Sequence, residues 1–130
     1  MNKEKAKHGS INWRDLTHTN ADELRNFYSK VAGWTFEGIP MEDEQGEYED
    51  YVMKAEGNSA VAGICHNRGV NTEIPPQWIM YISVENIKHS LGEALNLGGK
   101  IIKEYTSKEG ELIYVMIQDP KGTLFALAQI

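Results

Sequence analysis

The order of structural signals in the first half of this chain recurs in the second half, and this restricts the fold more than any single motif does. Asn20 and Asn86 each precede an apolar stripe with helical spacing, and asparagine is favoured at the N-terminus of a helix. Glu23 is placed to complete a capping box with the first asparagine. Gly33-Trp34 and Gly99-Lys100 follow the two stripes, and glycine commonly ends a helix. Both correspondences span 66 residues, which predicts two copies of one module.

A further correspondence lies in the strands after each helix. Tyr51-Val52-Met53 recurs as Tyr114-Val115-Met116, 63 residues later, so we expect one loop to be three residues shorter in the second copy. Alternating and β-branched segments predict one strand before each helix and three after it, with Pro40 ending the second strand. These strands are expected at 11–16, 34–39, 48–55 and 59–65, and again at 78–84, 100–105, 112–118 and 123–129.

The composition is typical of one globular domain. The chain has 130 residues, 41% of them hydrophobic and 25% charged, which indicates neither disorder nor a membrane span. The segment from Met1 to Lys7 lacks the apolar core of a secretory signal. Cys65 is the single cysteine, which excludes an internal disulfide and a cysteine-rich zinc site. We expect a cytoplasmic protein with a flexible tail at 1–9, modules at 10–66 and 78–130, and a linker at 67–77.

The charge balance is acidic. The formal net charge is −6 at pH 7, and the isoelectric point is about 5.2, which argues against nucleic acid or a membrane surface as a partner. Much of the excess lies between Glu42 and Asp50. This stretch could attract a basic ligand by its field, but a solvated loop is the interpretation we favour.

Several of these residues together resemble the vicinal oxygen chelate superfamily, which includes glyoxalase, bleomycin-resistance proteins and extradiol dioxygenases. The resemblance covers residues 11–130 and implies an α+β fold, in which two βαβββ modules form a cupped, mostly antiparallel eight-stranded sheet with the helices outside. It also implies a ligand in the hollow of the cup and, often, a homodimer. The residues that carry it are Asn20, Phe27-Tyr28, Gly33-Trp34, Trp78, Tyr81, Val84, Gly98-Gly99 and the turn at 119–122 with the strand at 125–127.

The resemblance also implies four positions for metal ligands, which active members fill with His, Gln or Glu. In this chain these positions fall on Trp13, Gly63, Ile79 and Ala126. None of these side chains can donate a lone pair to a divalent cation. We therefore expect neither the usual metal nor another cofactor.

The residues expected to line the cup are mostly aromatic or flexible. Aromatic rings and methionine provide adaptable apolar area for a planar or cationic ligand. Asp15 lies in phase with Trp13 on the first strand, where a carboxylate could grip an amine or act as a base, or could instead pair with a neighbouring cation. The expected ligand-binding set is Trp13, Asp15, Tyr51, Met53, Tyr81 and Met116.

Three functions remain open from the sequence. The first is a metal-independent protein that binds a small aromatic or cationic molecule. The second is an enzyme of the same superfamily, namely a lyase, isomerase or dioxygenase acting on a small organic substrate with catalytic residues unknown. The third is a purely associative protein whose cup is filled by its own side chains. We favour the first, because the four positions of the usual chelators carry residues without donors.

Overall fold

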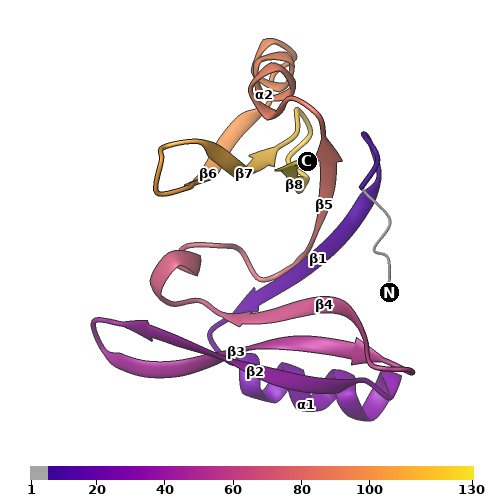
Figure 1. The fold of residues 1–130 in the computed structure, drawn as a ribbon. Helices are drawn as coiled ribbons and strands as arrows, with labels where there is room; N and C mark the ends of the chain where they lie inside the picture. Colours follow the sequence, from indigo (N-terminus) through magenta and orange to yellow (C-terminus); the bar gives the residue numbers. More distant parts are fainter. Residues whose placement is uncertain (1–5) are drawn as a thin grey trace. The chain divides into compact units, whose positions relative to one another are not determined.

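The computed structural model describes residues 6–130, which form an α+β fold of eight strands and two α-helices (Figure 1). The predicted strand–helix–strand–strand–strand order is confirmed in both halves. The elements are β1 (Ile11–His18), α1 (Ala21–Ala32), β2 (Thr35–Asp43), β3 (Gly46–Ala55), β4 (Ser59–His66), the short 3-10 helix η1 (Gly69–Asn71), β5 (Trp78–Val84), α2 (Ile87–Asn96), β6 (Lys100–Thr106), β7 (Leu112–Gln118) and β8 (Leu124–Gln129).

The chain divides into two compact units, which we call the first and second modules. The first module comprises residues 14–78, and the second comprises residues 79–130 with the described residues up to 13. In the first module the strands lie in the order β2-β3-β4-β1, with β1 parallel to β4 and the other pairs antiparallel. In the second module the order is β5-β8-β7-β6, with β5 parallel to β8.

Each module buries an apolar cluster between its sheet and its helix. In the first module Ala21 of α1 packs with side chains of β3 and β4, and in the second Ile87 of α2 packs with side chains of β5, β7 and β8. The two clusters consist of Ala21, Tyr51, Met53, Ala62 and Ile64, and of Val84, Ile87, Val115, Ile117 and Leu127.

Strand pairing shows where the duplication holds. Asp15 pairs with Gly63 in the first module, and Tyr81 pairs with Ala126 in the second. These equivalences reproduce the offsets of 66 and 63. The middle strand differs, because Gly63 pairs with Val52 on β3 whereas Ala126 pairs with Met116 on β7. The structural offset there is 64, so the match between Tyr51-Val52-Met53 and Tyr114-Val115-Met116 is one residue out of step.

The two helix starts are not alike. Asn86 caps α2 as predicted, because its side chain accepts a hydrogen bond from the backbone N–H of His89 at 3.1 Å. Asn20 makes no such bond, and its Nδ2 instead donates to Glu23 Oε2 at 2.8 Å. The predicted capping box at α1 is therefore wrong. Gly33 ends α1 with φ 73°, as expected for a left-handed C-cap.

Pro40 does not end the second strand. β2 continues through it to Asp43, so the prediction of a strand end there is wrong. β2 is the outermost strand of its module and pairs only with β3, and an edge strand tolerates a residue without an N–H. The acidic stretch after Pro40 is consequently part of the β2–β3 hairpin.

The described part of the N-terminal segment is attached to the second module. Gly9 N donates to Ser83 O at 2.6 Å, and Glu85 N donates to His8 Nδ1 at 3.0 Å. Residues 1–5 of the predicted tail lie outside the described residues. Within residues 6–130, neither helix has the length and apolar character needed to cross a membrane.

Candidate functional site

In each module one face of the sheet packs against a helix, and we call the opposite face the helix-free face. Side chains alternate along a strand, and residues paired across strands point to the same side. Asp15, Val52 and Gly63 therefore share the helix-free face of the first module. Trp13 precedes Asp15 by two residues on β1, so it shares that side of the strand, and its side chain is half-buried.

Tyr51 and Met53 lie on the other side of β3. Both are buried in the cluster that contains Ala21 of α1. They do not share a face with Asp15, which corrects the expected ligand-binding set. The alternation argument placed them wrongly because the sequence does not state which side of β3 the helix covers.

The most buried carboxylate of the first module's helix-free face is one that sequence reasoning missed. Asp50 is 6% exposed and accepts hydrogen bonds from His66 N at 2.8 Å and from Asn71 Nδ2 at 3.4 Å. A buried carboxylate needs such donors because it has lost the hydration of its charge. Its position in the acidic stretch was visible in the sequence, but its burial was not.

Cys65 lies beside this carboxylate. Burial raises the pKa of the Cys65 thiol, and the negative charges of Asp15 and Asp50 raise it further, the second also through a hydrogen bond. The sulfur is therefore held as a thiol, which is a poor nucleophile. The same contacts place two carboxylates near one sulfur atom.

A cavity of about 550 Å³ opens next to these groups, between the turn of the β2–β3 hairpin and the segment that follows β4. Arg68 lies in its wall and forms a two-pronged ion pair with Asp43, with both N–O distances at 2.8 Å. A second cavity, of about 560 Å³, lies on the same hairpin and includes Pro40, Tyr48 and Glu49 in its lining. Both volumes fall in the range of small-molecule sites.

A polar network also lies at the edge of α1. Tyr51 Oη donates to Asp22 Oδ1, and burial together with this carboxylate raises the pKa of Tyr51 to about 12. His66 Nε2 is 3.5 Å from the same Asp22 oxygen, and its Nδ1 is 2.7 Å from Glu49 O. The Arg25 guanidinium covers the Tyr51 ring, 4.6 Å from its centroid. These contacts join α1 to β3 and β4.

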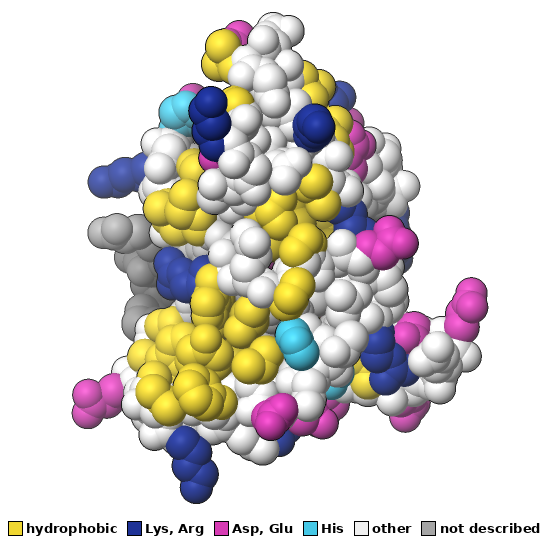
Figure 2. Space-filling model, turned by 180° about the vertical axis from the view of Figure 1, so that it is seen from behind, with side chains coloured by type: hydrophobic (Ala, Val, Ile, Leu, Met, Phe, Trp, Pro, Cys, Tyr) yellow, Lys and Arg dark blue, Asp and Glu magenta, His cyan; other side chains and the backbone are white. Residues whose placement is uncertain are grey.

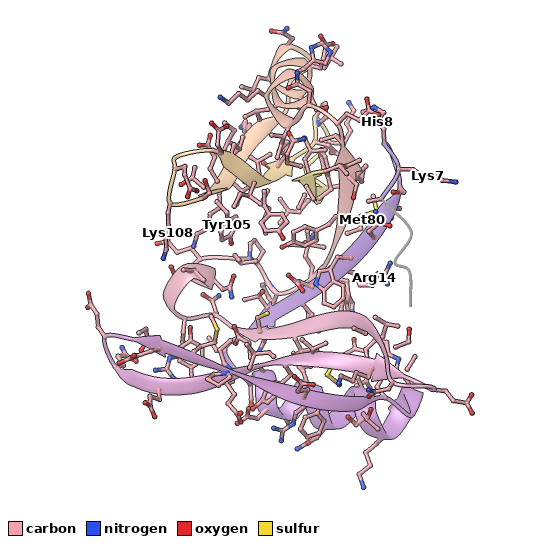
Figure 3. All side chains as sticks on the ribbon, viewed as in Figure 1. Lys7, His8, Arg14, Met80, Tyr105 and Lys108 are labelled. Atoms are coloured by element: carbon pink, nitrogen blue, oxygen red, sulfur yellow. The ribbon has the colours of Figure 1, made fainter. Side chains whose placement is uncertain are left out.

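The helix-free face of the second module is aromatic. Tyr81 and Met116 lie on it, because both pair with Ala126. The Tyr114 ring contacts Tyr81 edge to face at a centroid distance of 5.7 Å and contacts Tyr105 at 6.4 Å. Met116 is 2% exposed whereas Tyr114 is 43% exposed. Figure 3 labels Tyr105 on β6.

We call Tyr81, Tyr105 and Tyr114 the tyrosine ladder. Tyr81 comes from β5 and Tyr114 from β7, so their contact passes over β8, which lies between these strands. The β8 residues on this face are Ala126 and Ala128, whose small side chains leave room for the rings. Sequence reasoning found only one member of the ladder.

A different aromatic group surrounds the C-terminal half of α1. Tyr28 stacks on Trp34 at 5.8 Å and accepts a hydrogen bond from Trp78 Nε1 at 3.0 Å. Phe27 and Val31 of the same helix are exposed, at 54% and 68%. Hydrophobic side chains gather on one part of the face shown in Figure 2. This group lies on the helix side of the first module, away from its helix-free face.

The residues at the four implied metal-ligand positions do not fit a divalent cation. The pairings above confirm that Gly63 and Ala126 are equivalent, and Trp13 and Ile79 each lie two residues before the partners of these residues. None of the four side chains has a donor atom suited to such an ion. Among residues 6–130, no three His, Cys, Asp or Glu side chains are grouped to hold a metal ion.

Comparison with known proteins agrees with this architecture. A family model described as Glyoxalase/Bleomycin resistance protein/Dioxygenase superfamily matches residues 10–127. The "Putative glyoxylase CFP32" of Mycobacterium bovis and that of Mycobacterium tuberculosis are each 25% identical to this chain over 123 residues. The match covers 95% of this chain but only 46% of those proteins, so the chain spans about half their length.

Solved structures share the fold at low sequence identity. A methylmalonyl-CoA epimerase variant from Streptomyces coelicolor, in complex with 2-nitronate-propionyl-CoA, is 9% identical, with a TM-score of 0.57 over 95% of this chain and 98% of that chain. The methylmalonyl-CoA epimerase from Mycobacterium tuberculosis is 11% identical, with a TM-score of 0.56 over 99% of this chain and 92% of that chain.

Proposed function

The chain belongs to the Glyoxalase/Bleomycin resistance protein/Dioxygenase superfamily, and from this premise we propose that it binds a small organic molecule without the divalent metal used by many of its relatives. The observation that carries the proposal is the tyrosine ladder over Ala126. Where the resemblance implies a chelating side chain, the chain has a methyl group flanked by phenol rings.

The chemistry of the ladder favours a planar or largely apolar ligand. Edge-to-face rings present apolar area together with hydroxyl groups, so they can cover a ring system and hydrogen-bond to its polar substituents. Lys103 Nζ lies 5.8 Å from the centroid of the Tyr105 ring and adds one positive charge beside the ladder. Binding would depend mainly on apolar burial, worth roughly 25 cal/mol per Å² before the cost of association.

Fluorescence titration with anilinonaphthalene sulfonate, a planar apolar dye, tests this proposal. Tyr114→Ala should weaken dye binding about tenfold, because it removes the exposed ring of the ladder. Phe27→Ala is the matched control, since it removes a similarly exposed ring from α1 and should leave binding unchanged. Equal binding by wild type and both variants would overturn the assignment to the ladder.

Native mass spectrometry of the protein purified from cells gives an independent test. A co-purified organic molecule without metal is the expected result, and a retained divalent ion at one equivalent would contradict it. The same spectrum reports the subunit count. We include a homodimer in the proposal, because it is what the family resemblance implies.

A second candidate function is catalysis that uses carboxylates in place of a metal. It is favoured by one observation, which is that Asp15 and Asp50 both lie close enough to Cys65 to raise the pKa of its thiol. A positioned carboxylate can act as a general base. The names of the relatives suggest 2-oxoaldehyde–thiol adducts and acyl-CoA thioesters as substrates to test.

Asp15→Asn should abolish turnover of such a substrate, whereas Glu23→Gln, a change of the same kind on exposed α1, should not. Activity retained in Asp15→Asn would remove Asp15 from the mechanism. A folded wild-type protein that is inactive on both classes would leave small-molecule binding as the only proposal.

A further inference from the structure

The segment that follows β4, residues 67–74, is the part of the first module with the least apolar support. None of the residues of η1 within it is buried, and Val70 is 59% exposed. Glu73 has φ 67°, a left-handed conformation that is costly for a residue with a side chain. Ile74 is 4% exposed and anchors the end of the segment. Segments of this kind open locally at low free-energy cost.

Polar contacts to the β2–β3 hairpin hold this segment in place. Arg68 Nε and Nη2 each donate to Asp43 at 2.8 Å, and the Arg68 guanidinium lies 4.1 Å from the centroid of the Tyr48 ring. Tyr48 Oη donates in return to Arg68 O at 3.3 Å. The arginine is therefore held by a carboxylate, an aromatic face and a hydroxyl at once. We call Arg68, Asp43 and Tyr48 the clasp.

The backbone of the segment is adapted to this clasp. Gly69 has φ 55°, and a Cβ atom at this position would lie 2.7 Å from Tyr48 Oη. Any larger residue would therefore meet a hydroxyl of the clasp. The backbone hydrogen bonds of the segment are short-range, from Asn71 N to Arg68 O and from Thr72 N to Gly69 O, so no strand pairing opposes its release.

The segment covers the buried carboxylate of the helix-free face. Asn71 donates to Asp50 Oδ2 at 3.4 Å, and Asp50 in turn accepts a hydrogen bond from the Cys65 thiol. If the segment lifts, Asp50 loses one of its donors and the sulfur loses its cover. The clasp thus connects a surface ion pair to the environment of two buried groups.

We propose that residues 67–74 form a strap that opens as a unit, and that the clasp of Arg68 on Asp43 and Tyr48 controls solvent access to Asp50 and Cys65. Ionic strength and the charge of Asp43 then set the open population, because an ion pair near the surface weakens with screening. This inference concerns only the first module and does not depend on the identity of any ligand.

Hydrogen exchange of the whole chain, followed at the amides of Asn71 and Thr72, tests the strap. Arg68→Met removes the charge but keeps most of the stem, and it should speed exchange of these amides about tenfold, which is typical for loss of a charge-assisted pair. Lys54→Met is the matched control, because it breaks the Lys54–Glu37 ion pair on the same hairpin. It should leave exchange in the strap unchanged.

Alkylation of Cys65 by iodoacetamide gives the second readout. The rate should rise about tenfold in Arg68→Met, in proportion to amide exchange, and should also rise with sodium chloride in the wild type. Asp43→Asn provides the test from the other partner if Arg68→Met does not fold. Unchanged strap exchange in the folded variants, or faster exchange with an unchanged alkylation rate, would overturn the proposal.

Discussion

Tyr81 on β5 lies opposite Ala126 on β8 in the parallel pairing of the second module. This pairing places a phenol beside the position that relatives with a metal fill with a ligand. The equivalent pair in the first module is Asp15 with Gly63. One of these four residues, Asp15, carries a charged group, and a single carboxylate does not make a chelating set.

We expect the purified protein to retain no divalent metal at one equivalent after dialysis against zinc or manganese. Its midpoint of thermal unfolding should also be the same with and without EDTA, because a metal that binds the folded state would stabilise it. Elemental analysis of the dialysed protein measures the first quantity and calorimetry the second. A metal-dependent rise in the midpoint would show a binding site that the donor set does not reveal.

Tyr51 should be the source of an alkaline loss of stability. Its folded-state pKa is raised from 10.0 to about 12 by burial first and by the Asp22 carboxylate second. A group with a raised folded pKa contributes its full stability below the unfolded pKa and loses it as the pH rises. The free energy of unfolding should therefore fall between about pH 10 and pH 12. Tyr51→Phe should remove this part of the pH dependence, as measured by urea denaturation.

The two asparagines before the helices should respond differently to alanine. Asn86→Ala should lower the free energy of unfolding by about 1 kcal/mol, because its side chain caps the His89 amide. Asn20→Ala should cost much less, because no backbone amide of α1 donates to its side chain. Equal losses for the two variants would contradict the capping geometry described above.

Two glycines should respond to alanine with opposite signs. Gly92 lies inside α2, and a methyl group added there would have no neighbouring atom within 4 Å, so Gly92→Ala should stabilise the protein by about 0.5–1 kcal/mol through helix propensity. Gly69→Ala should destabilise it by about 1–2 kcal/mol, because a left-handed residue with a Cβ is strained and the new atom meets Tyr48 Oη. Thermal or chemical unfolding of both variants measures the difference.

Much of the fold could be predicted from the chain alone. The bounds of β5 and β7 agree with the expected segments to the residue, because both are apolar runs between clear turn signals. The prediction at Pro40 is wrong, because proline is excluded from a strand only where its missing N–H faces a neighbour. Nothing local to that residue shows that β2 is an edge strand.

The candidate site was harder to predict, because it depends on which side of a strand faces the helix. Alternation predicts Tyr81 on the ligand face, and Tyr81 lies on a helix-free face, but the same argument does not find its ladder partners Tyr105 and Tyr114. It misplaces Tyr51, whose tripeptide matches the one at Tyr114. The two residues nevertheless occupy opposite faces of their modules.

The sequence by itself determined the repeated order of strands and helices, and it determined that the implied ligand positions hold Trp, Gly, Ile and Ala. Tertiary structure decided that β3 and β7 are offset by 64 residues and not by 63. Because side chains alternate along a strand, a shift of one residue moves every side chain to the other face. Only the pairing of β3 with β4 and of β7 with β8 sets that register, through contacts between residues that are not adjacent in the chain.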